Sequence, residues 1–453
     1  MTAADTTNAQ LSYVEGSLAP VAEELTLTDL DVSGSLPADL CGRYVRNGPN
    51  PIGADPAAYH WFTGYGMVHG VRLEDGEARW YRNRYVRTAA VSEALGEAPI
   101  DGPQPPEGAG ASVNTNVIRI AGRTLALVEA GAFPIELSED LTSVGGCDFD
   151  GTLMGAYTAH PAYEPAARSW HAMTYFWPEE GVRYLVVGPE GRVTHNEFLD
   201  LGERIMLHDT ALTSSRVLVF DMPVTFNVEA AMSGATFPYR WNPERPARVG
   251  AIPLRGSADE ISWCEVPQCY VFHSANARDL DGDRVSIDVV RWPRMFDTDP
   301  LGPNEGVSTL ERWVLDFGRG RATTEVLDDR MQEFPRYDYR RSGTENRHAY
   351  AIAMDGAVRN ATALLCHDLV AGTTAEVSFG PGTAPHEFVF VPRAGAAADD
   401  ETDGWLVGYV SDRAAGTTDL VVVGAADPGA GPVARVHIPA RIPDGFHGNW
   451  ISD

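Results

Sequence analysis

Short apolar stretches separated by turn residues recur along nearly the whole chain of 453 residues. Each stretch is rich in Val, Leu, Ile or Tyr and is broken by Gly, Asp, Ser or Pro, which is the signature of a β-hairpin. Clear examples cover residues 116–130, 184–198, 208–224 and 404–425. Helical periodicity is scarce and is confined to short segments at 91–98 and after Phe226. The pattern predicts an all-β protein.

The hairpins follow one another without an obvious linker. This continuity favours a closed ring of blades, a β-propeller, over two stacked sandwiches. We interpret the small-residue segments at 394–404 and 424–432 as surface loops between strands, because both are rich in turn-forming residues. We therefore expect a single domain spanning residues 1–453, with residues 1–20 as a flexible or peripheral N-terminal segment.

The charged residues of the chain disfavour some partners and exclude some mechanisms. Its formal net charge is −28, whereas binding to nucleic acid or anionic lipid depends on clustered Lys or Arg. All 35 basic residues are arginine, so Schiff-base chemistry and a P-loop lysine are excluded as well.

The chain also lacks the usual signals for membranes, secretion and zinc. No apolar run approaches the roughly 18 to 20 residues needed to span a bilayer, and the segment MTAADTTNAQ lacks the apolar stretch of a secretory signal. The five cysteines have no paired CxxC spacing that would indicate zinc. We expect a cytoplasmic protein with mostly buried, reduced thiols.

Four of the twelve histidines stand far apart, each in its own short motif. They are His160 in YTAHPAYEP, His208 in MLHDTALT, His273 in VFHSANARD and His447 in GFHGNW. The inner strands of successive propeller blades line one axis, so residues distant in sequence can converge there. The set predicts a metal site on that axis. It leaves the metal open, because imidazole binds copper and zinc more tightly than ferrous iron.

With their flanks, these motifs resemble those of the carotenoid cleavage oxygenase family. The resemblance runs nearly end to end and takes in all four histidine motifs. Its further segments are GRYVRNGPNP (42–51), HWFTGYGMVHGVRL (60–73), YRNRYVRT (81–88), NTNV (114–117) and LVEAG (127–131). The resemblance implies a seven-bladed β-propeller, a metal on the propeller axis, and a cap of loops and short helices over one face. It also implies one Fe(II) per chain, bound by His160, His208, His273 and His447.

The resemblance implies three carboxylates behind these ligands. Glu129, Glu333 and Glu387 match glutamates that accept the outer ring N–H of His208, His273 and His447, respectively. Such partners fix the tautomer and the orientation of a metal-bound imidazole. Glu387 directly follows His386 in a strand, so only one of the two can face the axis; we expect it to be the glutamate.

The resemblance also bears on the oxygen site, where Thr115 matches a threonine whose methyl lies over the open position beside the iron. The reaction that it implies is addition of both oxygen atoms of O2 across one C=C bond, which gives two carbonyl products.

The residue at position 128 is the main evidence in the sequence for which alkene is the substrate. Relatives that cleave hydroxystilbenes or phenylpropenoids carry a lysine just before the equivalent of Glu129, and that lysine contacts the substrate phenol. Here the position is Val128, and the chain contains no lysine. Phe272 is a candidate wall of the substrate tunnel. A carotenoid or apocarotenoid is therefore the preferred substrate, and a stilbene or phenylpropanoid alkene is the alternative.

Other classes of function stay open on the residues alone. A propeller with acidic axial residues could be a metal-dependent hydrolase or lactonase, although calcium and magnesium prefer oxygen ligands to imidazole. A non-catalytic binding propeller is the remaining alternative. We expect a monomer that takes a small lipophilic alkene and O2, binds no nucleic acid and makes at most weak peripheral membrane contact, because the proline-rich segment from Ala89 to Gly110 lacks a convincing membrane-inserting helix.

Overall fold

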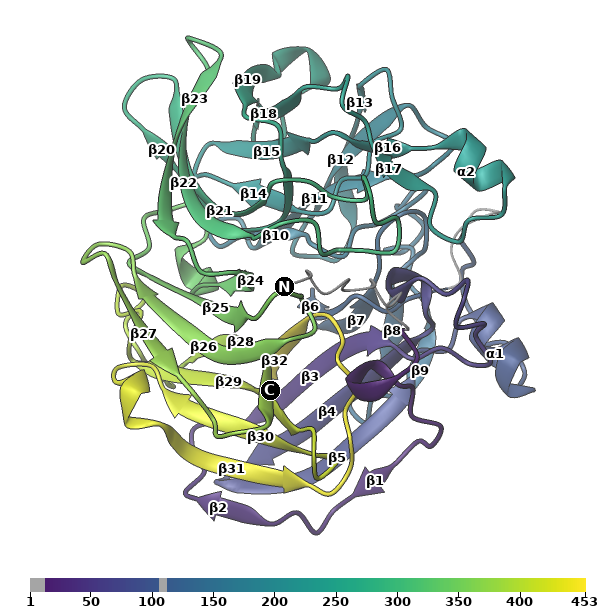
Figure 1. The fold of residues 1–453 in the computed structure, drawn as a ribbon, viewed down its shortest axis with the longest axis vertical. Helices are drawn as coiled ribbons and strands as arrows, with labels where there is room; N and C mark the ends of the chain where they lie inside the picture. The colour runs from purple at the N-terminus through teal and green to yellow at the C-terminus, as the bar shows by residue number, and fades with distance from the viewer. Residues whose placement is uncertain (1–12, 106–111) are drawn as a thin grey trace, which may run out of the picture.

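The computed structural model describes residues 13–105 and 112–453, and its strands form a ring of mainly antiparallel sheets (Figure 1). We number the blades of this ring along the chain and give the strands of each from the axis outward. Blade 1 contains β32 (Gly448–Ser452), β3 (Gly42–Pro49), β4 (Gly66–Glu74), β5 (Glu77–Tyr85) and β1 (Thr26–Leu27). Blade 2 contains β6 (Asn116–Ile120), β7 (Arg123–Leu127), β8 (Ile135–Leu137) and β9 (Ser143–Gly146). Blade 3 contains β10 (Ala162–Glu164), β11 (Ser169–Tyr175), β12 (Gly181–Val187) and β13 (Val193–Asp200).

The remaining four blades follow in the same way. Blade 4 contains β14 (Thr210–Leu212), β15 (Arg216–Asp221), β18 (Ala247–Pro253) and β19 (Ser262–Val266). Blade 5 contains β20 (Tyr270–Leu280), β21 (Arg284–Trp292), β22 (Thr309–Asp316) and β23 (Arg321–Asp328). Blade 6 contains β24 (Gln332–Arg336), β25 (His348–Met354), β26 (Ala361–Asp368) and β27 (Thr373–Val377). Blade 7 contains β28 (Thr383–Pro392), β29 (Gly404–Asp412), β30 (Thr417–Gly424), β31 (Pro432–Ile438) and β2 (Val32–Gly34).

The predicted all-β propeller is confirmed. Blades 4 and 5 are continuous as one eight-stranded sheet, because β19 and β23 share a single parallel pair in which Glu265 lies opposite Arg321. The ring closes in blade 1, where the C-terminal strand β32 pairs with the N-terminal strand β3. All four hairpins expected from the sequence are present, in blades 2, 3, 4 and 7.

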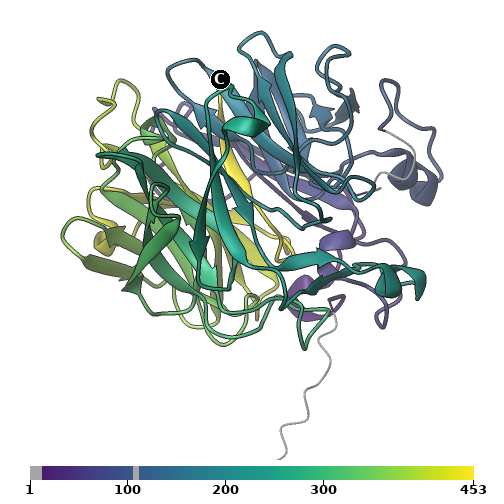
Figure 2. The same cartoon turned by 90° about the horizontal axis from the view of Figure 1, so that it is seen from above.

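Little of the described chain is helical. The two α-helices, α1 (Ala89–Leu95) and α2 (Val228–Met232), lie where short helices were predicted and project from the periphery of the ring (Figures 1 and 2). The short strands β16 (Val224–Phe226) and β17 (Tyr239–Trp241) form a hairpin around α2. The 3-10 helices are η1 (Gly16–Leu18), η2 (Trp61–Thr63), η3 (Ala258–Glu260), η4 (Tyr339–Arg341) and η5 (Pro428–Ala430). None of the described helices is long and apolar enough to cross a membrane.

The core lies between the blades. Its largest cluster runs through blades 3, 4 and 5 and fully buries Trp292 and Trp313. All five cysteines are free thiols. Of the predicted N-terminal segment 1–20, residues 1–12 lie outside the described residues. The rest packs against the body, since Tyr13 and Leu18 are buried and the Tyr13 hydroxyl donates to the carbonyl oxygen of Leu301 at 2.5 Å.

Candidate metal centre and its two cavities

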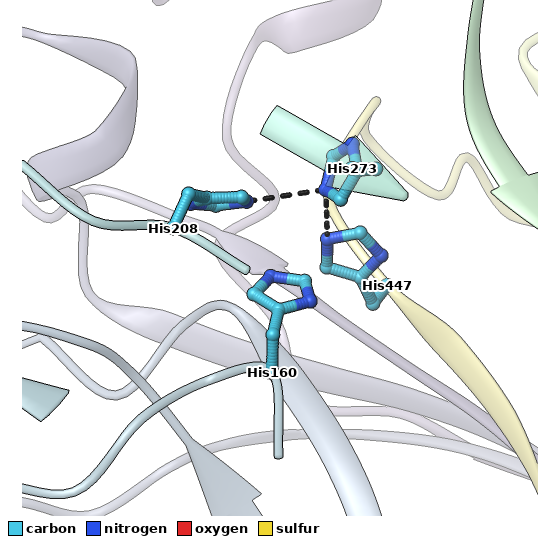
Figure 3. A group of neighbouring side chains, drawn as sticks. All are labelled: His160, His208, His273 and His447. Atoms are coloured by element: carbon cyan, nitrogen blue, oxygen red, sulfur yellow. Dashed lines mark hydrogen bonds between the residues drawn. The ribbon is translucent and has the colours of Figure 1, made fainter. Parts of the chain in front are cut away.

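The structure brings the four separated histidines together (Figure 3). His160 lies just before β10, His208 just before β14, His273 within β20 and His447 just before β32. Each comes from the innermost strand of its blade or from the residues that lead into that strand, and one potential ligand nitrogen from each lies within 4.8 Å of the others.

Three of the histidines meet through the same ring nitrogen. The Nε2 atoms of His208 and His273 are 3.1 Å apart, and those of His273 and His447 are also 3.1 Å apart. Metal–imidazole bonds of about 2.1 Å place neighbouring ligand atoms of one ion about 3 Å apart. The spacing therefore suits ligands that share a single ion.

The outer nitrogen of each of these three rings faces a carboxylate. The Nδ1 atom of His208 lies 2.6 Å from Glu129 Oε1, and that of His273 lies 2.6 Å from Glu333 Oε2. The Nδ1 atom of His447 lies 3.0 Å from Glu387 Oε1. Among the described residues, no carboxylate contacts the ring of His160, and its Nε2 atom is buried without a hydrogen bond.

The neighbour of Glu387 points elsewhere. His386 Nε2 lies 2.7 Å from Ser411 Oγ, and its Nδ1 atom contacts the buried guanidinium of Arg46. The structure therefore places the glutamate, and not the histidine, against His447.

Irregular backbone aims several of these side chains at the axis. The strand register shifts in β20 around His273, in β24 between Glu333 and Arg336, and in β28 between Pro385 and Phe388. Such bulges turn a side chain that regular alternation would direct elsewhere. Glu333 is followed by a left-handed Phe334 with a φ of 57°. Such backbone is costly for a bulky residue and persists only where the surrounding structure enforces it.

The electrostatic environment differs from one ring to the next. Burial lowers the pKa of His273, but the carboxylates of Glu333, Asp209 and Glu387 together outweigh this effect, so the pKa lies above its usual value. The pKa of Glu333 is lowered, because His273 and the indole N–H of Trp292 more than offset burial. Burial lowers the pKa of His447 to about 4, although Glu387 opposes the shift. Burial, followed by the three neighbouring histidines, holds the pKa of His160 well below its usual value.

These contacts fit a cation. A carboxylate only accepts hydrogen bonds, so the Nδ1 atoms of His208, His273 and His447 carry the ring protons and their Nε2 atoms present lone pairs to one another. Lone pairs 3.1 Å apart need a positive charge between them, either a proton or a metal ion. The carboxylates behind the rings carry more negative charge than the buried Arg336 offsets, which favours a divalent cation at this point.

Arg336 is a residue of the site that the sequence analysis missed. Its Nε atom lies 3.5 Å from Glu387 Oε1, and its Nη2 atom donates to the carbonyl oxygen of Gly448 at 2.8 Å. It thus links the carboxylate behind His447 to the strand that carries His447. A lone arginine in a strand carries no distinctive sequence signal, so only the fold could identify it.

On one side of the histidines lies an apolar cavity of about 300 Å³. His208, His273 and His447 form part of its wall, together with Thr115, Val128 and Phe272, which the sequence analysis had selected. Most of the remaining wall is aromatic or aliphatic, and includes Trp61, Phe62, Tyr175, Phe237, Phe334 and Phe446. Two of these, Trp61 and Phe62, belong to the motif HWFTGYG, whose aromatic content was a signal for them.

On the other side lies a second, more polar cavity of about 210 Å³, lined by His160 and by a mixture of polar and apolar residues. This wall includes Asp209, Asn276, Arg336 and Asn449. Residues next to the histidines, such as Asp209 and Ser274, line this cavity. The metal centre is therefore a partition between an apolar and a polar space.

Comparison with known proteins gives one consistent family. The family model described as retinal pigment epithelial membrane protein, RPE65, matches residues 18–452. A carotenoid cleavage oxygenase of Mycobacterium tuberculosis is 42% identical over 501 aligned positions that cover 99% of each chain. The crystal structure of a lignostilbene dioxygenase of Pseudomonas brassicacearum has a TM-score of 0.88 at 26% identity and covers 98% of this chain and 99% of its own. A variant of the apocarotenoid oxygenase of Synechocystis has a TM-score of 0.85 at 26% identity, with coverage of 96% and 97%.

Proposed function

Because the chain belongs to the carotenoid cleavage oxygenase family, we propose that it is a ferrous dioxygenase that cleaves one C=C bond of a carotenoid or apocarotenoid. Its site residues on this proposal are the four ligands His160, His208, His273 and His447 and the three carboxylates Glu129, Glu333 and Glu387. The observation that carries the proposal is the apolar cavity, which ends directly at three of the histidines.

Ferrous iron, when bound, supplies the activation of dioxygen. The residues of the chain bind the ion, orient its ligands and position the alkene. Glu129, Glu333 and Glu387 hold three imidazoles in the tautomer that presents Nε2 to the ion. No anionic donor lies among the four ligands, which favours the ferrous state because nothing stabilises the extra charge of ferric iron.

The cavity wall positions the alkene. Apolar side chains such as Phe272, which packs edge-on against His208 with ring centroids 5.2 Å apart, bind a polyene without a polar anchor. Which double bond is cleaved then depends on how far the polyene enters the cavity. The methyl group of Thr115, 6% exposed in the same wall, narrows access to the ion.

A stilbene is the second candidate, favoured by the likeness to the lignostilbene dioxygenase. Val128 disfavours it. This apolar side chain lies in the cavity wall next to Glu129 and cannot donate to a phenolate oxygen.

The test combines metal analysis with turnover under 18O2. The purified protein is expected to bind one iron per chain and to give two 18O-labelled carbonyl products from an apocarotenoid, with much slower turnover of a hydroxystilbene. Faster cleavage of the hydroxystilbene would make the second candidate correct. The absence of labelled product from either substrate, with iron bound, would contradict the oxygenase proposal.

A further inference from the structure

We propose that the polar cavity behind His160 is the route by which the metal ion enters the centre, with Asp209 as the carboxylate that receives it. This inference rests on the proposed function, since it concerns how the same four-histidine site is loaded. It assigns the two cavities different tasks: the apolar one takes the alkene, and the polar one takes the hydrated ion.

The two cavities differ in what they can admit. A hydrated divalent ion that enters an apolar space loses water without compensation, and the cost is many kcal/mol. Most of the wall of the apolar cavity is apolar, and its two carboxylates, Glu129 and Glu333, already contact histidines of the centre. The polar cavity offers the side-chain amides of Asn116, Asn276 and Asn449, the hydroxyl of Thr210 and the carboxylate of Asp209. Oxygen donors of this kind can replace the water shell of a divalent ion stepwise.

His160 is the histidine that stands at this entrance. Of the four, it lines the polar cavity, whereas His208, His273 and His447 line the apolar one. Glu129, Glu333 and Glu387 each contact the Nδ1 atom of one of the other three rings, and none of them contacts His160. The three carboxylates therefore orient three of the four ligands, and His160 is the ring that they leave without such a partner (Figure 3).

Asp209 supplies negative charge on the path. It is 8% exposed, and its Oδ2 atom accepts from both the backbone N–H and the hydroxyl of Ser274 at 2.7 Å. Its Oδ1 atom accepts from the N–H of Thr210 at 2.8 Å. These bonds hold the carboxylate in the wall and leave lone pairs unused. Two arginines line the same cavity: Arg336 contacts Glu387, and Arg119 is exposed and donates to the carbonyl oxygen of Ser452.

The test measures the rate at which metal-free protein takes up cobalt(II), whose absorption changes when it binds nitrogen ligands. The variants are Asp209→Asn, which removes the charge, and Ala162→Phe, which narrows the polar cavity. Thr236→Trp, which narrows the apolar cavity, is the matched control. Equilibrium affinity is measured separately by competition with a chelator.

We expect Asp209→Asn and Ala162→Phe to slow association about tenfold, the lower range of rate effects ascribed to focused charge. A gate changes entry and exit together, so dissociation slows equally and Kd stays within about twofold. Thr236→Trp leaves both rates unchanged. Slower uptake in Thr236→Trp with normal uptake in Ala162→Phe would overturn the proposal. So would a changed Kd in Asp209→Asn with an unchanged association rate, because that result makes Asp209 a stabilising charge and not a gate. Failure of the unsubstituted protein to bind cobalt or iron would instead contradict the proposed function.

Discussion

Glu333 shows how much of the site depends on single contacts. One of its oxygens lies 2.6 Å from His273 Nδ1, and the other accepts from the indole N–H of Trp292 at 2.8 Å. The carboxylate is 3% exposed, so its charge is compensated by its neighbours and not by solvent. Because His273 is the ring whose Nε2 atom meets those of both His208 and His447, the orientation of this one imidazole sets the centre of the cluster.

The glutamine substitution Glu333→Gln tests this role. We expect iron affinity to fall roughly 10- to 100-fold, because the amide oxygen is a weaker acceptor for the His273 ring and loses the negative charge. Glu311→Gln is the matched control, since Glu311 also accepts from a buried indole, that of Trp313 at 2.8 Å, but contacts no histidine of the cluster. Equal affinities of the two variants in a chelator competition would refute the assignment of Glu333. His273→Ala, by contrast, should abolish binding.

At the scale of the strand, the close approach of β32 to β3 sets the position of His447. Gly448 follows this histidine, and its N–H donates to Glu387 Oε2 at 2.7 Å. A Cβ atom at Gly448 would lie 2.2 Å from the hydroxyl oxygen of Tyr44 on β3. That hydroxyl donates to the carbonyl oxygen of Glu387 at 2.9 Å. A glycine is therefore required where the strand passes the tyrosine and the carboxylate.

The substitution Gly448→Ala should consequently affect both stability and metal binding. We expect the free energy of unfolding to fall by about 1 to 3 kcal/mol, as for other overpacked cores, and iron affinity to fall with it, because Tyr44 and Glu387 must shift. In Gly424→Ala, at the end of β30, the new methyl group meets nothing within 4 Å, so neither quantity should change appreciably. Denaturant unfolding and metal titration of both variants make the comparison. If the Gly448→Ala protein were as stable as Gly424→Ala, β3 and β32 could move apart without any loss of stability, and the prediction would be wrong.

At the scale of the molecule, every blade contributes to the centre. Blades 3, 4, 5 and 1 supply His160, His208, His273 and His447, whereas blades 6 and 7 supply Glu333 and Glu387. Blade 2 supplies Glu129, just after β7. An ion at this point ties together strands from the whole ring.

Metal removal should therefore destabilise the protein as a whole. A ligand that binds the folded state alone adds about 2.7 kcal/mol at a free concentration 100 times its Kd. We expect the Tm to drop on treatment with a chelator and to rise with added ferrous iron under anaerobic conditions. An identical Tm with and without iron would mean that the four histidines do not bind it in the folded state.

Buried histidines remote from the centre should make the metal-free protein sensitive to mild acid. Burial lowers the pKa of His60 to about 3, and those of His171 and His367 to about 4. Their pKa in the unfolded chain is about 6.5, so between pH 6.5 and about 4 the unfolded state binds more protons. The free energy of unfolding then falls as the pH falls, by up to about 1.4 kcal/mol per pH unit for each histidine.

His367→Gln should reduce the pH dependence of the free energy of unfolding by the contribution of about one proton. The measurement is urea unfolding at pH 6.5 and at pH 4.5. His437→Gln is the control, because His437 lies on the surface with 46% of its side chain exposed. A pH dependence unchanged by His367→Gln would mean that this histidine is protonated in the folded protein.

The sequence by itself determined the type of structure and the metal-site residues to test. Turn residues at short intervals predict hairpins because backbone and side-chain preferences are local. The four histidine motifs can be recognised in the sequence because each is a short run of consecutive residues. Only the tertiary structure decided how these parts meet. Hydrophobic alternation does not encode the bulges that pair Glu129, Glu333 and Glu387 with particular rings. The same holds for the side of the strand to which Glu387 and His386 turn. The role of Arg336 and the division into an apolar and a polar cavity depend on contacts between residues more than one hundred positions apart, such as Arg336 and Gly448. Such contacts exist only when the ring closes, because that closure brings distant strands to one axis.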